Sequence, residues 1–361
     1  MANQGLLFMP DISGFTKFIH QTEVDHSRFI IQELLEALIN SNQLQLQVSE
    51  IEGDAILFYR FGEIPPLELI YDQVKAMFCS FHKILRSNSQ RRICMCSACR
   101  QADSLTLKVV THKGIFSTYK VKEYSKLIGP DIITVHHLLK NEIPIHEYWL
   151  ISDSFFSLQN ETVKLPEMLK WEKGHKQTEN GKIDFYYSLL SPLKEELELV
   201  QQVKPGIKGK RVKILSSEKE YNVSIQKLFS VIGDISHKPR WMENVKGTTH
   251  ISSPINQIGT SHQCLLDKSI EIMTTSDFYS DDSTIVMEET DKKKMFTCQF
   301  ELVKKEEFKT LLIMNFFMKK NILLLTMFHL FMKNSFIKKI NQSLQNLQAF
   351  LNTDEAVSCH C

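Results

Sequence analysis

The stretch FMPDISGFT, from Phe8 to Thr16, constrains this chain more than any other part of its sequence. Its apolar start predicts a buried strand over residues 5–11, and the Ser-Gly pair after Asp11 and Ile12 interrupts that strand. Phe15 and Thr16 then begin a helical pattern. A carboxylate at a strand end, next to the N–H groups of a helix start, suits a metal ion that carries a phosphate. A buried strand, a turn and a helix cap account for the same residues, so this stretch alone leaves both interpretations open.

Composition limits the broad class of the protein. The chain has 361 residues, 43% hydrophobic and 24% charged, with a net charge of +1. These values are typical of a globular protein with two domains or one large domain, and they do not favour nucleic acid or a membrane surface as a partner. The most apolar region, residues 311–332, is interrupted by polar side chains, and no secretion signal is present, so we expect no membrane span and a cytoplasmic location.

The periodicity of the first half predicts an α+β domain over residues 1–190. The expected order of strand, helix, hairpin, helix and strand is ferredoxin-like, with helices on one face of an antiparallel sheet. Residues 88–103 are polar and predict a loop. Asn180-Gly181 predicts a hairpin turn within residues 170–189. The expected elements are strands over 5–11, 44–50, 55–60, 105–111 and 114–122, and helices over 16–40, 67–85 and 132–139.

Residues 191–210 contain a charged helical piece and the sequence Lys204-Pro205-Gly206, which predict an interdomain linker. A second domain is expected over residues 211–352, with a tail over 353–361. Ser224 is expected to cap its first helix, and residues 323–351 carry one apolar stripe at helical spacing. Further expected elements are strands over 211–223, 246–252, 259–267, 269–279, 283–290, 295–304 and 308–318, and short helices over 225–232 and 234–242.

Asp11 and Asp54 are the most specific candidate pair of metal ligands in the sequence. Each aspartate stands at the end of its strand, and a ferredoxin-like order places these strands side by side. Both carboxylates are therefore expected to reach one point, where Mg²⁺ or Mn²⁺ and a triphosphate fit.

Four stretches resemble class III adenylate and guanylate cyclase domains. Residues 8–16 resemble the motif Phe-x-Asp-Ile-x-Gly-Phe-Thr, and residues 52–55 resemble the second metal motif, built on Gly-Asp. Residues 109–114 resemble the strand Gly-Ile-His-x-Gly, and residues 129–138 lie where cyclases carry Gly-x-x-Val-Asn-x-Ala-x-Arg. The resemblance covers about the first 190 residues and implies a homodimer that binds ATP or GTP. It also implies two metal ions at Asp11, Ile12 and Asp54, and nucleotide contacts at Ser13, Gly14, Phe15 and Thr16.

The sequence departs from the cyclase pattern at the positions that complete the reaction. The asparagine of the family falls at Ile133 and its arginine at His137, and neither residue supplies the charge of a guanidinium. His137, or the neighbouring His136, is the candidate substitute. The purine-selecting positions fall at Glu50 and Lys126, a combination that fits neither the adenylate nor the guanylate type.

Cys94, Cys96 and Cys99 place three thiols within six residues. A Zn²⁺ site or a redox site is one interpretation, with Cys79, His82 or His112 as a fourth ligand. Loop cysteines without metal are the alternative.

The second half resembles the helix-grip fold of START-like, polyketide-cyclase-type domains. The resemblance rests on residues 223–229, on Asp234 with Trp241, on the turn at Gly259 and on the final helix. It implies an apolar cavity for a small hydrophobic ligand. The methionines and phenylalanines between residues 314 and 332 are expected to lie in the core or to line that cavity.

Three functions remain open from the sequence. The first is a nucleotidyl cyclase regulated by a hydrophobic ligand. The second is a nucleotide sensor that binds metal and has lost turnover. The third is a carrier of hydrophobic molecules, whose cyclase-like domain serves only dimerisation.

Overall fold

The computed structural model describes residues 3–22, 24–94, 96–157, 165–197, 211–267 and 269–353. The chain forms two compact units. The first comprises Met1–Ser87 with Gln101–Leu199, and the second comprises Asn88–Arg100 with Val200–Cys361. Residues 198–210 of the linker expected over 191–210, including Lys204 to Gly206, and residues 354–361 of the expected tail lie outside the described residues. No helix within the described ranges is both long and apolar enough to cross a membrane.

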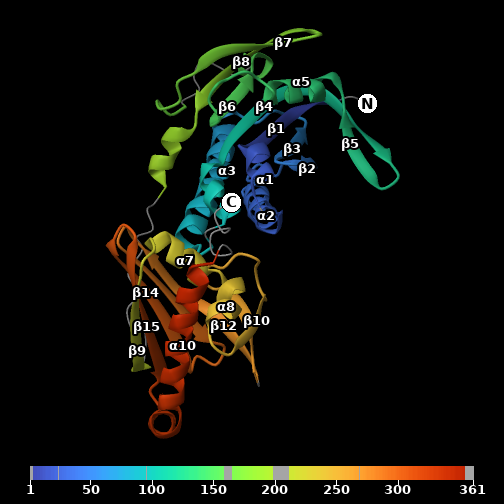
Figure 1. Ribbon diagram of the computed structural model, residues 1–361. Helices are drawn as coiled ribbons and strands as arrows, with labels where there is room; N and C mark the ends of the chain where they lie inside the picture. Colours follow the sequence, from blue (N-terminus) through green and yellow to red (C-terminus); the bar gives the residue numbers. More distant parts are fainter. Residues whose placement is uncertain are drawn as a thin grey trace. The chain divides into compact units, whose positions relative to one another are not determined.

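The first unit contains a mixed α+β fold built on an eight-stranded sheet (Figure 1). Its strand order is β2-β3-β1-β4-β6-β8-β7, with β5 paired to β4. All described pairs are antiparallel except β4 with β6. The strands are β1 (Asn3–Ser13), β2 (Gln47–Glu52), β3 (Ala55–Phe61), β4 (Thr106–Val121), β5 (Tyr124–Ile128), β6 (Tyr148–Ser152), β7 (Glu172–Thr178) and β8 (Gly181–Leu189).

The β2–β3 hairpin lies beside β1, as the sequence predicts. However, β1 is buried on both faces from Gly5 to Ser13, so the expectation that helices cover only one face is wrong at this strand. Leu7 and Met9 point to one face, where they share an apolar core with Val135 and Leu138. These last two residues belong to helix α5 (Pro130–Leu139), which therefore covers the face of β1 that carries Asp11.

Several predicted boundaries in the first unit are wrong. The single helix expected over 16–40 is two helices, α1 (Phe15–His20) and α2 (Val24–Asn40). The helix α3 (Leu67–Arg91) continues beyond residue 85, and the expected loop 88–103 contains α4 (Ser97–Gln101) and the 3₁₀ turn η1 (Ala102–Ser104). The remaining short elements are α6 (Asp153–Phe156) and the 3₁₀ turn η2 (Ser191–Glu196).

The residues expected as two strands, 105–111 and 114–122, form the single strand β4. Gly114 does not turn the chain. It lies opposite Gly5 in the pairing of β1 with β4, and a Cβ on Gly5 would lie 2.8 Å from the Phe116 ring. The partner of the distal half of β4 is β5, and this hairpin extends away from the rest of the sheet in Figure 1.

Strand β6 was not predicted. All five of its residues are buried, so it has no polar–apolar alternation, and a run of this length does not distinguish a strand from a helix. The Asn180-Gly181 prediction is confirmed, because β7 and β8 pair antiparallel up to Thr178 and Gly181.

The second unit contains a seven-stranded antiparallel sheet of order β10-β11-β12-β13-β14-β15-β9. Ser224 caps α7 (Ile225–Gly233) as predicted, accepting a hydrogen bond from the Lys227 N–H group. The strands are β9 (Arg211–Tyr221), β10 (Val245–His250), β11 (Ser261–Leu266), β12 (Ile270–Ser280), β13 (Thr284–Asp291), β14 (Phe296–Glu306) and β15 (Lys309–Lys319). The short helices are η3 (Ile235–His237) and α8 (Lys238–Trp241).

The C-terminal helix begins at Ile322 and includes a π-helical segment. It runs through α9 (Ile322–Met327), η4 (Phe328–Met332) and α10 (Lys333–Leu351). Ile340, Leu344 and Leu347 are buried, as the predicted stripe requires. The expectation that the neighbouring Met and Phe residues lie in the core or line a cavity does not hold for all of them, because Phe331 is 80% exposed and Met332 is 57% exposed.

Candidate metal centre

Asp11 and Asp54 lie beside each other. In the antiparallel pairing of β1 with β3, Asp11 stands opposite Ala55, the residue that follows Asp54. The Ile12 N–H group donates to the backbone oxygen of Asp54 at 3.1 Å, which holds the β2–β3 turn against the end of β1. Asp11 is 7% exposed, and its neighbour Ile12 is fully buried.

The charge of Asp11 acts on the carboxyl group of Asp54. Burial, followed by the negative charge of Asp11, raises the pKa of Asp54 from 3.8 to about 6. Lys108 compensates part of this charge, since its Nζ lies 3.0 Å from Asp11 Oδ2. The same ammonium donates to the backbone oxygen of Leu139 at 3.4 Å, at the end of α5.

Lys108 is the site residue that the sequence analysis missed. It stands directly opposite Asp11 in the pairing of β1 with β4, so register alone brings the two charges together. The sequence feature that could have identified Lys108 is its position between Leu107 and Val109 in an apolar run. It marks a buried charge that needs a partner.

Ser13 and Gly14 form the turn between β1 and α1. Gly14 has φ +92°, a left-handed conformation that a side chain would strain. The Ser13 Oγ atom is buried and has no hydrogen-bond partner among the described residues. Phe15 and Thr16 begin α1, whose backbone bonds start with Phe18 N–H to the Gly14 oxygen at 3.0 Å.

This donor set fits a hard divalent cation. Two carboxylates and a free hydroxyl oxygen are the ligand types that Mg²⁺ and Mn²⁺ prefer. With Lys108 included, the three side chains carry a net charge of −1 when both aspartates are ionised. An unpartnered buried oxygen and an excess of negative charge are both relieved by a bound cation.

The two purine-selecting positions lie together. Lys126, on β5, forms an ion pair and a hydrogen bond with the Glu50 carboxylate on β2. The Lys126 side chain is 53% exposed and that of Glu50 is 20% exposed. Their unusual combination in the sequence is therefore a neutralising pair within one chain.

The positions of the missing cyclase residues lie on α5. Ile133 is 55% exposed and offers no polar atom. His137 is half-buried, whereas the adjacent His136 approaches an acidic group, with Nδ1 3.6 Å from Glu52 Oε2.

His112 belongs to a separate hydrogen-bond network, with Asp131 and Ser152. Its Nε2 lies 3.0 Å from Asp131 Oδ1 and its Nδ1 lies 2.7 Å from Ser152 Oγ. Asp131 also accepts from the Ile115 N–H group at 2.6 Å. Since a Cβ on Gly114 would lie 2.2 Å from Asp131 Cβ, the glycine permits this approach. The same network lines an open pocket of about 540 Å³.

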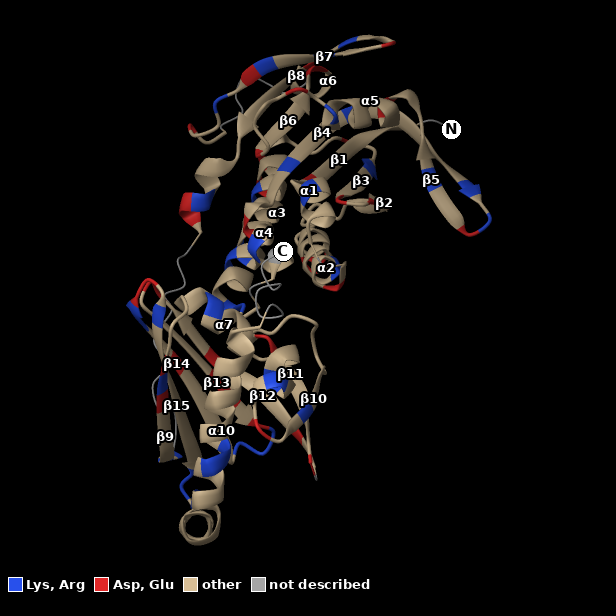
Figure 2. Cartoon of the chain, viewed as in Figure 1, with Lys and Arg blue, Asp and Glu red and all other residues tan. Residues whose placement is uncertain are grey.

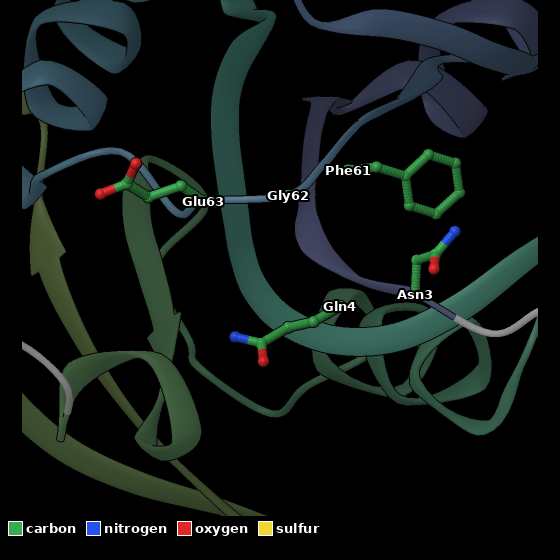
Figure 3. Close-up of a pocket in the computed structure, with 5 residues that line it drawn as sticks. All are labelled: Asn3, Gln4, Phe61, Gly62 and Glu63. Atoms are coloured by element: carbon green, nitrogen blue, oxygen red, sulfur yellow. The ribbon is translucent and has the colours of Figure 1, made fainter.

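A second open pocket, of about 580 Å³, is far from the aspartates along the strands. Figure 3 shows the residues that line it: Asn3 and Gln4 at the start of β1, and Phe61 with Gly62 and Glu63 at the end of β3. Asp11 stands near the other end of β1, and Asp54 precedes the start of β3. Size alone therefore does not identify the candidate metal centre.

The predicted cysteine site is brought together only in part. The sulfur atoms of Cys94, Cys96 and Cys99 lie within 4.8 Å of one another. Cys79 belongs to α3 in the first unit, and His82 contacts Glu147 at 3.1 Å. With His112 held by Asp131, the histidines proposed as a fourth ligand are engaged elsewhere.

Acidic and basic positions are interspersed over both units in Figure 2, in agreement with the small net charge. The described residues in this view therefore show no surface of one charge sign that would steer a polyanion.

A family model described as a protein of unknown function (DUF2652) matches residues 31–148. A curated relative, "Uncharacterized protein Rv2561/Rv2562" from Mycobacterium tuberculosis, is 33% identical over 132 residues. That alignment covers 37% of this chain and 61% of the relative. Each match covers well under half of the chain.

Solved structures similar to this chain include nucleotidyl cyclase domains. The catalytic core of a rhodopsin-guanylyl cyclase in complex with ATPαS is 15% identical, with a TM-score of 0.39, and the match covers 52% of this chain and 96% of that chain. The guanylate cyclase domain of RhGC from Catenaria anguillulae in complex with GTP is 15% identical, with a TM-score of 0.38. That match covers 52% of this chain and 96% of the RhGC domain. The adenylyl cyclase CyaB from P. aeruginosa is 13% identical, with a TM-score of 0.37, and the match covers 52% of this chain and 95% of CyaB. Likeness at this level assigns no activity to this chain.

Proposed function

We propose that the first unit binds ATP or GTP together with Mg²⁺ or Mn²⁺ at Asp11 and Asp54. The single observation that carries this proposal is the position of two carboxylates beside each other at the end of paired strands. Their resemblance to the cyclase metal motifs, and the unpartnered Ser13 hydroxyl next to them, support the same ligand class.

The charges suggest how two ions would be accommodated. Without nucleotide, one divalent cation changes the net charge at Asp11, Asp54 and Lys108 from −1 to +1. A triphosphate adds further negative charge, so the second ion is expected to arrive with the nucleotide. The proposed nucleotide contacts are Ser13 to Thr16, Glu50 and Lys126, and the proposed assembly is a homodimer.

Binding is a stronger expectation than turnover. In the cyclase reaction, the ribose 3′-hydroxyl attacks the α-phosphate and pyrophosphate leaves. The apolar side chain of Ile133 offers no hydrogen bond to the developing charge, and loss of one such donor typically costs about 100- to 1,000-fold in rate. We therefore infer a nucleotide-binding sensor whose cyclase activity is slow or lost.

Titration of the full chain with fluorescent ATP and GTP analogues in the presence of Mn²⁺ tests this function. Asp11→Asn should weaken binding by at least about 100-fold, because replacing even a residue that supports a metal ligand costs 10- to 100-fold. Asp25→Asn, which removes an exposed carboxylate on α2, is the matched control and should bind as the unaltered chain does.

The outcomes separate the functions. Cyclic nucleotide formed by the unaltered chain and lost in Asp11→Asn supports a cyclase. Metal-dependent binding without product supports the sensor. Binding that is absent, or equal in both variants, contradicts the nucleotide proposal.

We also propose that the second unit binds a small apolar molecule, as its START-like resemblance implies. The observation that favours this is a buried charged group near Trp241, which belongs to the apolar core of this unit. Lys238 Nζ lies 2.6 Å from both carboxylate oxygens of Glu289 and 2.9 Å from His262 Nε2. Trp241, three residues after Lys238, is fully buried, and its Nε1 has no partner among the described residues. A few polar groups within an apolar lining are typical of ligand sites.

Mass spectrometry of organic extracts from the purified chain tests this second function. A molecule that co-purifies with the unaltered chain should be reduced in Trp241→Phe, which removes the indole N–H and keeps an aromatic ring. Equal recovery from both chains would exclude Trp241 as a contact. Recovery of no apolar molecule would contradict the carrier function.

A further inference from the structure

Residues 92–94 are tied by their backbone to the second unit. The Ile93 and Cys94 N–H groups donate to the Asn256 oxygen at 2.9 and 3.2 Å, and Arg92 pairs with Gln257 in an isolated antiparallel bridge. The Ile93 side chain is fully buried in the apolar core of that unit. The chain immediately before the cysteine cluster is therefore held in one place.

Asn256, which receives these bonds, is itself fixed. Its Nδ2 donates to the Gly233 oxygen at 2.9 Å, and its Oδ1 accepts from Thr275 Oγ1 at 2.8 Å. A buried amide with both ends satisfied is a rigid anchor. The position of Cys94 is thus set by a network that lies outside its own segment.

The other end of the cluster is formed by α4. Cys96 precedes this helix, and its backbone oxygen accepts from the Arg100 N–H group at 3.1 Å. The Cys99 N–H group lies 3.5 Å from Cys96 Sγ, and Cys99 is fully buried. N–H groups directed at sulfur are the interactions that orient thiolates in metal sites.

We propose that Cys94, Cys96 and Cys99 bind one Zn²⁺ ion through three thiolate sulfurs. Their sulfurs lie within 4.8 Å of one another. In a tetrahedral site with Zn–S bonds of about 2.3 Å, neighbouring sulfurs stand about 3.8 Å apart, so a small closure suffices. Three thiols lose their protons when the ion binds, and the fourth position takes a water molecule or one further donor.

The chemistry of the donors favours zinc over the other ions proposed for this chain. Three soft sulfurs suit Zn²⁺, whereas Mg²⁺ and Mn²⁺ require oxygen. A disulfide would use two of the thiols and leave the third without a role. The structure places none of these three cysteines in a disulfide.

The site has a structural consequence. Asn88–Arg100 interrupts the sequence of the first unit but belongs to the second. A zinc ion would join Cys94, next to the Asn256 anchor, to Cys96 and Cys99 at α4. This role is independent of nucleotide binding at Asp11.

Metal analysis of the full chain, purified under reducing conditions without chelator, tests the proposal. We expect one zinc per chain, and an intense sulfur-to-metal charge-transfer absorption after replacement of zinc by Co²⁺. Cys96→Ser should lower zinc affinity at least about tenfold and weaken that absorption. Cys79→Ser is the matched control, because it removes a half-buried thiol of the first unit, and it should keep one zinc.

Thiol protection in the unaltered chain provides a measurement that does not depend on how the variants fold. Zinc should protect Cys94, Cys96 and Cys99 from alkylation, and a chelator should expose them together, as peptide mass spectrometry would reveal. Absence of zinc, or alkylation that zinc does not change, would overturn the proposal.

Discussion

The carboxyl group of Asp54 is held next to that of Asp11, and burial together with this negative neighbour raises the pKa of Asp54 to about 6. The folded state therefore holds the Asp54 proton more tightly than the unfolded state does. This difference stabilises the folded state fully below pH 3.8, and the stabilisation is lost as the pH rises through 6. Without metal, the ionised pair above pH 6 is therefore a source of strain that a cation can relieve.

Mn²⁺ binding should accordingly depend on pH. We expect affinity to fall by up to about tenfold per pH unit below pH 6, because protonation of Asp54 competes with the metal. In Asp11→Asn the repulsion is removed, so the pKa of Asp54 should decrease while burial keeps it above 3.8. Carboxyl carbon chemical shifts, measured without metal, would report this value, and an unchanged pKa would contradict the pairing.

The Glu50–Lys126 pair predicts a change in purine preference. Removing the lysine in Lys126→Ala frees a carboxylate, which can accept hydrogen bonds from the guanine N1–H and amino groups but not from adenine in the same way. Affinity for GTP should then rise relative to ATP in competition binding. Lys122→Ala, on the same hairpin, is the control, and an equal change for both nucleotides would exclude the pair from base selection.

Gly114 predicts a local packing defect. In Gly114→Ala the new Cβ would meet Asp131, which should weaken the contacts of Asp131 with His112 and the Ile115 N–H group. Overpacking of this kind typically costs about 1–3 kcal/mol. Hydrogen exchange should accelerate in α5, whereas the control Gly247→Ala, whose nearest atom is 4.0 Å away, should leave exchange unchanged.

His262 predicts acid sensitivity of the second unit. Burial, and then the positive charge of Lys238, lowers the pKa of His262 to about 4. A lowered pKa contributes stability above pH 6.5, and this stability is lost as the pH falls toward 4, because the unfolded state then binds the proton more readily. The difference corresponds to roughly 3 kcal/mol at most.

Urea denaturation of the second unit, followed by hydrogen exchange at β11 and β13, measures this dependence. Between pH 7 and pH 4.5 the unaltered chain should lose stability, and His262→Gln should flatten the pH dependence. A profile with the same slope in both chains would place the acid sensitivity elsewhere.

The sequence alone determined those features that depend on local pattern. The hairpin at Asn180-Gly181, the cap at Ser224 and the approach of Asp54 to Asp11 follow from turn chemistry, capping and strand order. Strand β6 escaped prediction because burial on both faces removes alternation. Gly114 led to the wrong prediction of two strands, because a glycine can mark either a turn or a close approach of two segments. Which of the two applies depends on what packs against the glycine, and the local sequence does not contain that information.

Only the tertiary structure decided the partners of individual charges and thiols. Lys108 meets Asp11 through the register of β1 with β4, and Lys126 meets Glu50 across strands far apart in sequence. The cysteine segment joins the second unit through Asn256, more than 150 residues away. Register and long-range packing are properties of the whole folded chain, because a side chain's neighbours are set by elements that its own sequence window does not contain.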